Sequence, residues 1–340
     1  MAKIDVTELD IFYISYDEPN CEEHWADLLN KVPWAKRVHG VKGFDKAHKT
    51  AAEQSETDRF ITVDGDNIVM DDFFEQKLEV PDQDHDGNNI SESIFSWNAK
   101  NILNGLVYGN GGLKCWPTEY TKTINTHEAA TDGEGMEFCW KLNYIQLNDT
   151  FSEVHQTASP FQAFRAGFRE GVKMSLDQGA RIRPDEFKQK VWWQNYNRLQ
   201  TWCNIGSDVD NGLWAIYGAR LGCEMTVLSD WDTNQISDFE WFKDFFNNEV
   251  APQFSGFNNP NRHEITTCRY SKLEWDYNLL HEAVCELGTK LNSEINEMML
   301  FDPNDDMSKF FKATYVNPRR WGVMIREQQI QDMLEKGLIT

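Results

Sequence analysis

Short apolar runs alternate with helix-patterned stretches along the first 70 residues of the chain. Apolar and aromatic side chains come in blocks of four to seven, which is typical of buried strands, and Asp64 ends the third block. The first helical stretch begins with Asn20 and Glu23, spaced as in a capping box. Because strands and helices alternate, the pattern predicts an α/β, doubly wound sheet. Strands are predicted at 9–15, 37–41 and 60–63, and helices at 20–29 and 44–55.

Helical periodicity dominates the second half of the sequence. Ser159, Pro160 and Gln162 carry the signals of a helix start, and that helix should end at Gly179. The next stretch is predicted to be capped by Ser207 or Asp208, to end at Gly222 and to be followed by a strand over 223–228. We therefore predict an α/β domain over 1–230 and a helical region over 231–340 packed on it. The helices expected in this region cover 239–246, 271–299 and 323–338.

Charge and apolar content narrow the classes of function. The 340 residues carry a formal net charge of −22 and a pI near 4.7, which disfavours bulk, non-specific binding to nucleic acid or to anionic membranes. No apolar stretch approaches the ~18 residues of a membrane span, and the first residues lack an apolar signal core. The seven cysteines show no Cys-x-x-Cys spacing. A cytoplasmic protein with free thiols, no membrane contact and no zinc site is expected.

The most informative polar residues follow the predicted strand over 60–63. Asp64, Gly65 and Asp66 place two carboxylates at the carboxyl end of that strand, where open α/β sheets bind their ligands. Oxygen ligands of this kind suit Mg²⁺ or Mn²⁺, and Gly65 leaves room for close approach to the backbone. A simple turn is the alternative, because Asp-Gly is also common in turns.

Three further stretches have both a chemical and a structural interpretation. The glycine-rich segment 104–114 ends in Lys114 and could approach a sugar or phosphate, or form a tight hairpin. Arg165, Arg169 and Lys173 form a cationic stripe that could face a phosphate or pair with Glu170 and other local acids. The basic residues between Lys31 and Lys49 are either solvated or, at Lys42 or Lys46, close to a diphosphate.

Residues 82–87 begin like an EF-hand calcium loop, with Asp82, Asp84, Asp86 and Gly87. The twelfth position of such a loop needs a bidentate Glu, and here it is Ser93. An exposed acidic loop is therefore the favoured interpretation, with calcium binding as the alternative.

Two stretches together resemble the nucleotide-sugar glycosyltransferases of the GT-A fold. The first runs from Lys42 to Asp66 and is similar to the helix and Asp-x-Asp segment of family 2 enzymes. The second, from Ser207 to Gly222, is similar to their Glu-Asp helix, with Ser207 where those enzymes have Glu. The resemblance covers roughly residues 9–230. It implies a GT-A, Rossmann-like mixed sheet flanked by helices, with a helical C-terminal extension.

The resemblance also implies a chemistry. Asp66, together with Asp64, would hold Mn²⁺ or Mg²⁺, which neutralises the leaving nucleoside diphosphate of a donor such as a UDP-sugar. Asp208, with Asp210 as the second candidate, would be the general base if the anomeric centre inverts. The donor sugar, the oligomeric state and the choice between inversion and retention stay open. The residues expected to bind the donor are Ser15, Tyr16, Asp17, Lys42, Asp64, Gly111, Gly112, Lys114 and Arg169.

The sequences of four segments, 14–20, 38–43, 108–114 and 164–173, are similar to those of bacteriophage glycosyltransferase-like proteins. These are associated with glucosyl or arabinosyl transfer to hydroxymethylated pyrimidines, so the implied acceptor is 5-hydroxymethylcytosine in phage DNA and the implied location is the cytoplasm of an infected host cell. Two alternatives remain, a nucleotidyltransferase and a non-enzymatic, acidic calcium-binding or structural phage protein.

Overall fold

The computed structural model describes residues 2–80, 83, 92–109, 111–126, 143–255 and 275–306. The chain divides into two compact units. Of the described residues, 2–102 and 107–155 belong to the first, here called the sheet unit. Residues 103–106 and 156–306 belong to the second, here called the helical unit.

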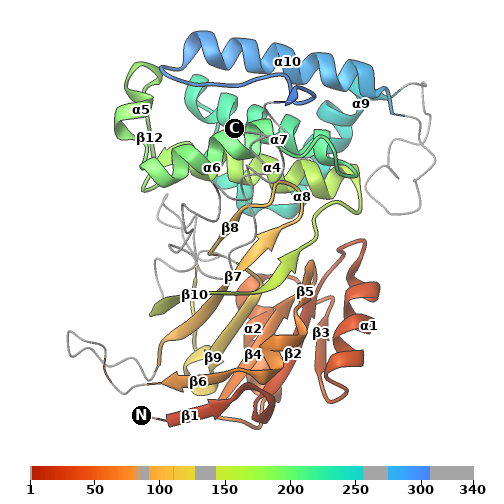
Figure 1. The fold of residues 1–340 in the computed structure, drawn as a ribbon, viewed down its shortest axis with the longest axis vertical. Coiled ribbons are helices and arrows are strands. Elements are labelled where there is room, and N and C mark those ends of the chain that lie inside the picture. The colour runs from red at the N-terminus through yellow and green to blue at the C-terminus, as the bar shows by residue number, and fades with distance from the viewer. Residues whose placement is uncertain are drawn as a thin grey trace, which may run out of the picture. The chain divides into compact units, whose positions relative to one another are not determined.

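The sheet unit is a mixed α/β structure, as the alternating pattern predicts (Figure 1). Its described residues form an eight-stranded sheet in the order β3-β2-β4-β9-β7-β10-β5, with β8 beside β7, and β1 pairs with β6 separately. Its strands are β1 (Ala2–Asp5), β2 (Asp10–Ser15), β3 (Lys36–His39), β4 (Arg59–Asp64), β5 (Asn67–Val69), β6 (Lys77–Val80), β7 (Ile94–Asn101), β8 (Val107–Tyr108), β9 (Leu113–Pro117) and β10 (Tyr144–Val154). Its helices are η1 (Val6–Glu8), α1 (Cys21–Lys31), α2 (Phe44–Gln54), η2 (Asp71–Glu75) and α3 (Thr118–Thr121).

Strand register determines which loops meet at the edge of the sheet. β2 runs parallel to both β3 and β4, and Ile14 lies opposite Asp64. The segments after β2 and β4 therefore leave the sheet side by side. β9 is antiparallel to β4 with Val63 opposite Leu113, so Gly112 arrives at the same edge from the other direction.

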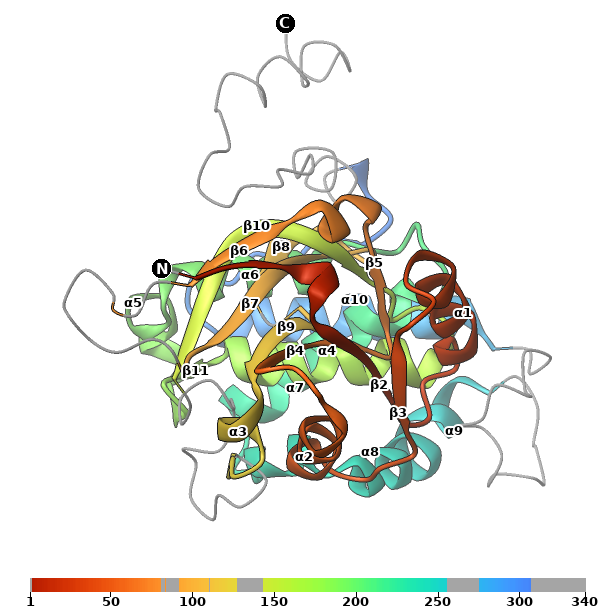
Figure 2. The ribbon, with the colours of Figure 1, turned by 90° about the horizontal axis from the view of Figure 1, so that it is seen from below.

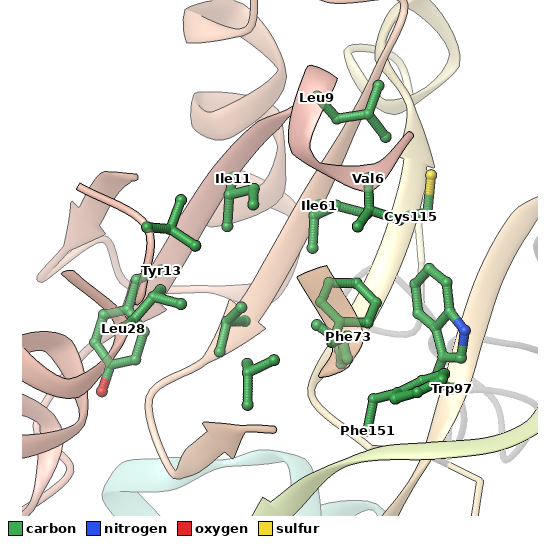
Figure 3. Packing of buried hydrophobic residues seen from close by; sticks show 14 of the residues in the cluster. Val6, Leu9, Ile11, Tyr13, Leu28, Ile61, Phe73, Trp97, Cys115 and Phe151 are labelled. Atoms are coloured by element: carbon green, nitrogen blue, oxygen red, sulfur yellow. The ribbon is translucent and has the colours of Figure 1, made fainter. Parts of the chain in front are cut away.

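Alternate residues of the central strands fill two separate cores, one on each face. Ile11, Tyr13 and Ile61 point to the face covered by α1, η1 and η2, where Figure 3 shows Phe73 against Trp97. Phe12 and Phe60 point to the opposite face, against the small residues of α2. Figure 2 shows α2 and η1 on opposite sides of β2 and β4. Burial on both faces explains why these strands read as continuous apolar runs.

The helical unit is built around two closely packed helices. Its elements are α4 (Pro160–Met174), β11 (Leu176–Asp177), β12 (Ala180–Arg181), η6 (Pro184–Glu186), α5 (Phe187–Lys190), α6 (Trp193–Asn204), α7 (Gly212–Leu228), η7 (Thr233–Ser237), α8 (Phe239–Phe245), the π-helix η8 (Phe246–Val250), α9 (Ala251–Phe254) and α10 (Tyr277–Glu294). A Cβ at Gly167 would overlap the carbonyl of Ala215, and one at Gly218 would overlap that of Phe164. Glycines on both helices thus let the two backbones approach closely.

Several predicted elements are confirmed and others are wrong. Ser159 caps α4 by accepting a hydrogen bond from the Gln162 amide, as expected. The helix ends at Met174, because a hairpin of β11 and β12 turns through Gln178 and Gly179 at positive φ. At α1, Asn20 occupies the N-cap position without making a side-chain capping bond, so that part of the predicted capping box is wrong.

The largest correction concerns α7. The predicted strand over 223–228 is helical, and Gly222 lies inside the helix instead of ending it. Nearly all of the helix is buried, so apolar residues occur on every side and the sequence loses its helical period. The predicted boundary at residue 230 falls inside the helical unit, between α7 and η7. The predicted helix over 323–338 and the acidic loop from Asp82 to Gly87, apart from Gln83, lie outside the described residues.

The close contact of α4 with α7 predicts the effect of one methyl group. Helix propensity alone would make Gly167→Ala stabilising by about 1 kcal/mol. Because the new Cβ would meet the Ala215 carbonyl, we instead expect a loss of about 1–3 kcal/mol in the free energy of unfolding, measured by urea denaturation. A stabilised Gly167→Ala variant would show that the two helices do not pack this closely.

Candidate functional site

The end of β4 carries the first of the two predicted metal-binding carboxylates. The Asp64 amide donates to the Gly112 carbonyl at 3.0 Å, which ties this residue to the start of β9. The Nζ of buried Lys114 lies 3.8 Å from Asp64 Oδ2 and donates to the Gly111 carbonyl at 2.7 Å. Loss of hydration raises the pKa of the Asp64 carboxyl, and Lys114 opposes that change. With 39% of its side chain exposed, Asp64 still reaches solvent.

Asp66, the second carboxylate, is held by Asn67 of β5 and by His155, the residue that follows β10. Asn67 Nδ2 donates to Asp66 Oδ1 at 2.7 Å, and the amide of His155 donates to the Asp66 carbonyl at 2.7 Å. Asn67 is buried, and its Oδ1 accepts from the Gly112 amide at 3.3 Å. One asparagine therefore links the acidic turn to the glycine segment.

The glycines of the 104–114 segment pack against the protein itself. A Cβ at Gly112 would overlap the side chains of Asp64 and Asn67, and one at Gly111 would lie 2.7 Å from the Cβ of Ala99. The start of this segment also belongs to a hairpin, because β8 pairs antiparallel with β7. Because these glycines lack side chains, the backbone that leads to Lys114 can pack closely against the end of β4.

Glu18 is a residue of this edge that the sequence did not single out. A Cβ on Gly65 would lie 2.7 Å from Glu18 Oε2 and 3.1 Å from the Cβ of Ser15, so Gly65 makes room for the glutamate. Glu18 Oε2 accepts from the Tyr16 amide at 2.8 Å. Burial and the nearby charge of Asp66 raise the pKa of Glu18 to about 7, against the two backbone hydrogen bonds that lower it. Its position three residues after a strand is too common a signal to identify it.

Two buried side chains hold the peptide between the acids. The hydroxyl of Tyr13 lies 2.7 Å from the Gly65 carbonyl and 2.9 Å from that of Cys21. His24 Nδ1 is 3.1 Å from the same Gly65 carbonyl. Burial lowers the pKa of His24, although the Gly65 contact favours its protonated form. The turn between Asp64 and Asp66 is thus held by side chains of β2 and α1 that contact its central carbonyl.

Three of the predicted donor-binding residues lie at the end of β2 (Ser15) and in the loop after it (Tyr16 and Asp17), and a cation approaches them from β3. Arg37 Nε donates to the Ser15 hydroxyl at 3.1 Å, and its guanidinium pairs with Glu22 at 2.7 Å. The Ser15 hydroxyl lies 3.0 Å from His39 Nδ1. Arg37 therefore connects β2, β3 and α1 at the sheet edge.

The outer positions of this edge are more open. Asp17 and Lys42 are exposed and Tyr16 is partly buried. Lys42 lies in the β3–α2 connection, which begins at Gly40, whose amide donates to the Ser15 carbonyl at 3.0 Å. The structure thus gathers the predicted donor-binding residues of the sheet unit along one edge.

Arg169, Asp208 and Asp210 belong to the helical unit. Asp208 and Asp210 are exposed in a turn between α6 and α7, and Ser207 of that turn donates to the Pro303 carbonyl at 2.6 Å. The predicted capping by Asp208 is wrong, because α7 begins at Gly212 after Asn211 in the left-handed conformation. The helix therefore starts too late for Asp208 to reach its free amides.

The cationic stripe on α4 includes one ion pair with a local acid and one contact with an aromatic ring. Lys173 lies 3.9 Å from Glu170, as expected for a local ion pair, while Arg165 stacks over the ring of Phe239 at 4.8 Å. Arg169, which lies between these two residues in the sequence, is partly buried. Arg165 thus has an aromatic partner that sequence spacing could not indicate.

The carboxylates at the sheet edge are chemically suited to Mg²⁺ or Mn²⁺, which prefer oxygen ligands. Asp66 would be the better ligand of the two, because Lys114 already provides a positive charge next to Asp64. Asn67 Nδ2 donates a hydrogen bond to Asp66 Oδ1 and so orients that carboxylate. A cation bound by Asp66 would supply positive charge at the point where β2 and β4 end.

The raised pKa of Glu18 predicts how stability depends on pH. Between the ordinary glutamate pKa of 4.5 and the folded value of about 7, the folded protein binds more protons than the unfolded chain, so stability falls as the pH rises. The difference between these two pKa values corresponds to about 3 kcal/mol in the free energy of unfolding. In EDTA, Glu18→Gln should match the wild type at pH 5 and exceed its free energy of unfolding at pH 8. Glu23→Gln, an exposed change on α1, is the control, and a Glu18→Gln variant with an unchanged pH profile contradicts the assignment.

No protein-family model matches the chain, and no curated protein matches it significantly. Among the described residues, no helix is both long and apolar enough to cross a bilayer. The function must therefore be inferred from the residues at the sheet edge and from the motifs in the sequence.

Proposed function

We propose that the protein is a metal-dependent glycosyltransferase of the GT-A type. It transfers a sugar from a nucleotide-sugar, with a UDP-sugar as the first choice, to a hydroxyl acceptor. The acceptor that the sequence resemblance favours is 5-hydroxymethylcytosine in phage DNA, in the cytoplasm of an infected cell. One observation carries the proposal: the register that sets Ile14 opposite Asp64 brings Ser15–Asp17 next to the Asp64–Asp66 turn.

The arrangement suits a nucleoside diphosphate for physical reasons. A donor of this kind needs a surface for the nucleoside, positive charge for the diphosphate and hard oxygen ligands for a divalent cation. The loop after β2 offers backbone and hydroxyl groups, Lys114 and Lys42 offer positive charge, and Asp66 offers the oxygen ligand. A bound Mn²⁺ or Mg²⁺ would supply the charge that stabilises the leaving diphosphate.

The acceptor hydroxyl needs a base if the anomeric centre inverts. Asp208 and Asp210 are exposed carboxylates in the turn of the helical unit that precedes α7. Because the turn is anchored through Ser207 to Pro303, either carboxylate can be presented to a substrate from a supported backbone. We take Asp208 as the first candidate and Asp210 as the second.

The central test is the reaction itself and its dependence on Asp66. The full chain should release a nucleoside diphosphate from a UDP-sugar when Mn²⁺ and hydroxymethylcytosine DNA are present, and mass spectrometry should find the glycosylated nucleoside. Asp66→Asn keeps an oxygen that can accept from Asn67 but loses the charge, so turnover should fall at least about 100-fold.

Asp71→Asn, a change at an exposed carboxylate of η2, is the control and should retain activity. Release of pyrophosphate instead of a nucleoside diphosphate would indicate a nucleotidyltransferase. Full activity of Asp66→Asn, or of the wild type in excess EDTA, would remove the metal from the proposal.

The assignment of Asp208 as the base predicts a loss of rate without a loss of stability. Since Asp208 is exposed and lies before the first turn of α7, Asp208→Asn, which keeps an acceptor oxygen, should unfold within about 0.5 kcal/mol of the wild type. Turnover should fall roughly 10²–10⁴-fold. Asp210→Asn tests the second candidate, and Asp230→Asn, also exposed in the helical unit, is the control. If Asp208→Asn keeps wild-type turnover while Asp210→Asn loses it, the base is Asp210.

A further inference from the structure

Three side chains of the helical unit, none of them among the candidate residues above, converge on one another. His281 and Cys285 are four residues apart on α10 and so lie on one face of it. His281 Nε2 is 2.7 Å from Asp302 Oδ1 and 3.7 Å from Cys285 Sγ. The imidazole, thiol and carboxylate atoms all lie within 4.8 Å of one another, and each side chain is partly exposed.

A buried arginine holds the two segments that carry these groups. Arg220 of α7 is 0% exposed, and its Nη1 donates to the Val284 carbonyl at 2.6 Å, one residue before Cys285. Its Nη2 donates to the Phe301 carbonyl at 2.6 Å, one residue before Asp302. Because the same guanidinium binds both backbones, the separation between α10 and residue 302 is fixed without any ion.

We propose that His281, Cys285 and Asp302 form a Zn²⁺ site. Thiolate and imidazole together favour zinc over Mg²⁺ or Mn²⁺, which prefer oxygen. Zn–S and Zn–N bonds of about 2.3 and 2.0 Å place sulfur and nitrogen about 3.6 Å apart in a tetrahedral site. The Cys285–His281 separation is 3.7 Å, so these two ligands need almost no rearrangement.

Binding changes protons and contacts in a defined way. The Cys285 thiol loses its proton to water and binds as thiolate, and His281 binds through Nε2 with its remaining proton on Nδ1. The carboxylate of Asp302 moves about 0.6 Å away from His281, since zinc-bound nitrogen and oxygen lie about 3.3 Å apart. Three protein ligands leave a fourth position for water.

A second cluster with similar residues provides the contrast. Cys21, Glu22 and His39 in the sheet unit also bring three ligand atoms together. The guanidinium of Arg37 already contacts all three of them, so a positive charge occupies the place that an ion would take. At the His281 cluster the neighbouring guanidinium, that of Arg220, instead donates to the backbone carbonyls of Val284 and Phe301.

The site would join α10 to the segment that follows it. Asp302 is adjacent to Pro303, whose carbonyl accepts from Ser207 in the turn before α7. Zinc would therefore brace the contact between α10 and the turn at 207–211. This role does not involve the carboxylates of the sheet unit, and the braced turn is the one that carries Asp208 and Asp210.

The test uses the full, metal-stripped chain without nucleotide-sugar. Addition of Co²⁺ should produce a thiolate-to-cobalt charge-transfer band, and Zn²⁺ should abolish it by competition. Cys285→Ser should lose the band, and His281→Ala and Asp302→Asn should bind Zn²⁺ more weakly, His281→Ala by at least about 100-fold. Circular dichroism of each variant without metal establishes that it remains folded.

Glu282→Gln, which removes an exposed charge from the same helix, is the matched control and should bind zinc as the wild type does. Asp66→Asn should also bind zinc normally, so failure of the zinc site and failure of the proposed function are separable. The proposal is overturned if the wild type gives no thiolate band with Co²⁺, or if a folded Cys285→Ser variant gives the same band.

Discussion

The close approach of the Gly111–Gly112 backbone to the end of β4 is the constraint on which the sheet edge depends. A side chain on Gly112 would overlap both Asp64 and Asn67, so the acidic turn and the start of β9 can occupy these positions only if that residue lacks a Cβ. Asn67 then uses its amide group twice, donating to Asp66 and accepting from Gly112. The two carboxylates are held by backbone geometry and one asparagine instead of by ion pairs alone.

The same physical device organises the helical unit. Gly167 and Gly171 of α4 meet the carbonyls of Ala215 and Ala219, and Gly218 and Gly222 of α7 meet α4 in return. Helices so close together leave no space for large side chains between them, and the bulky aromatic residues pack around the pair, as Phe168 does against Trp241 and Phe242. Glycine therefore has a packing role in both units, at a turn in one and between helices in the other.

Three buried or partly buried cations have fixed partners in a chain whose net charge is −22. Lys114 lies between a carbonyl and Asp64, Arg37 binds Glu22 and Ser15, and Arg220 donates to three backbone carbonyls. Burial lowers the pKa of Arg220, and the carbonyl partners offset part of the cost of removing its charge from water. Each of these cations joins segments that are far apart in the sequence, so the positive side chains act as links within the fold.

Local signals in the sequence were sufficient for five elements of the sheet unit. The strands β2, β3 and β4 and the helices α1 and α2 lie where the period of apolar residues predicted them, because each element buries one distinguishable set of positions. The Ser159 cap was readable for the same reason, since its hydrogen bond joins residues only three apart. The resemblance placed Ser15 and Asp64 in one site, and in the structure they lie close together because parallel β2 and β4 end at the same edge of the sheet.

Only the tertiary structure decided the features that depend on distant contacts. The α7 sequence predicts a helix to Gly222 and then a strand, yet burial on all sides makes it one helix and places Gly222 against Phe168. Glu18 became notable only when Gly65, 47 residues later, packed against it and burial raised its pKa. The His281, Cys285 and Asp302 cluster depends on Arg220, which fixes two backbones that no local spacing connects. Sequence periodicity records which side of an element is buried, whereas long-range packing determines which charges and ligands then meet.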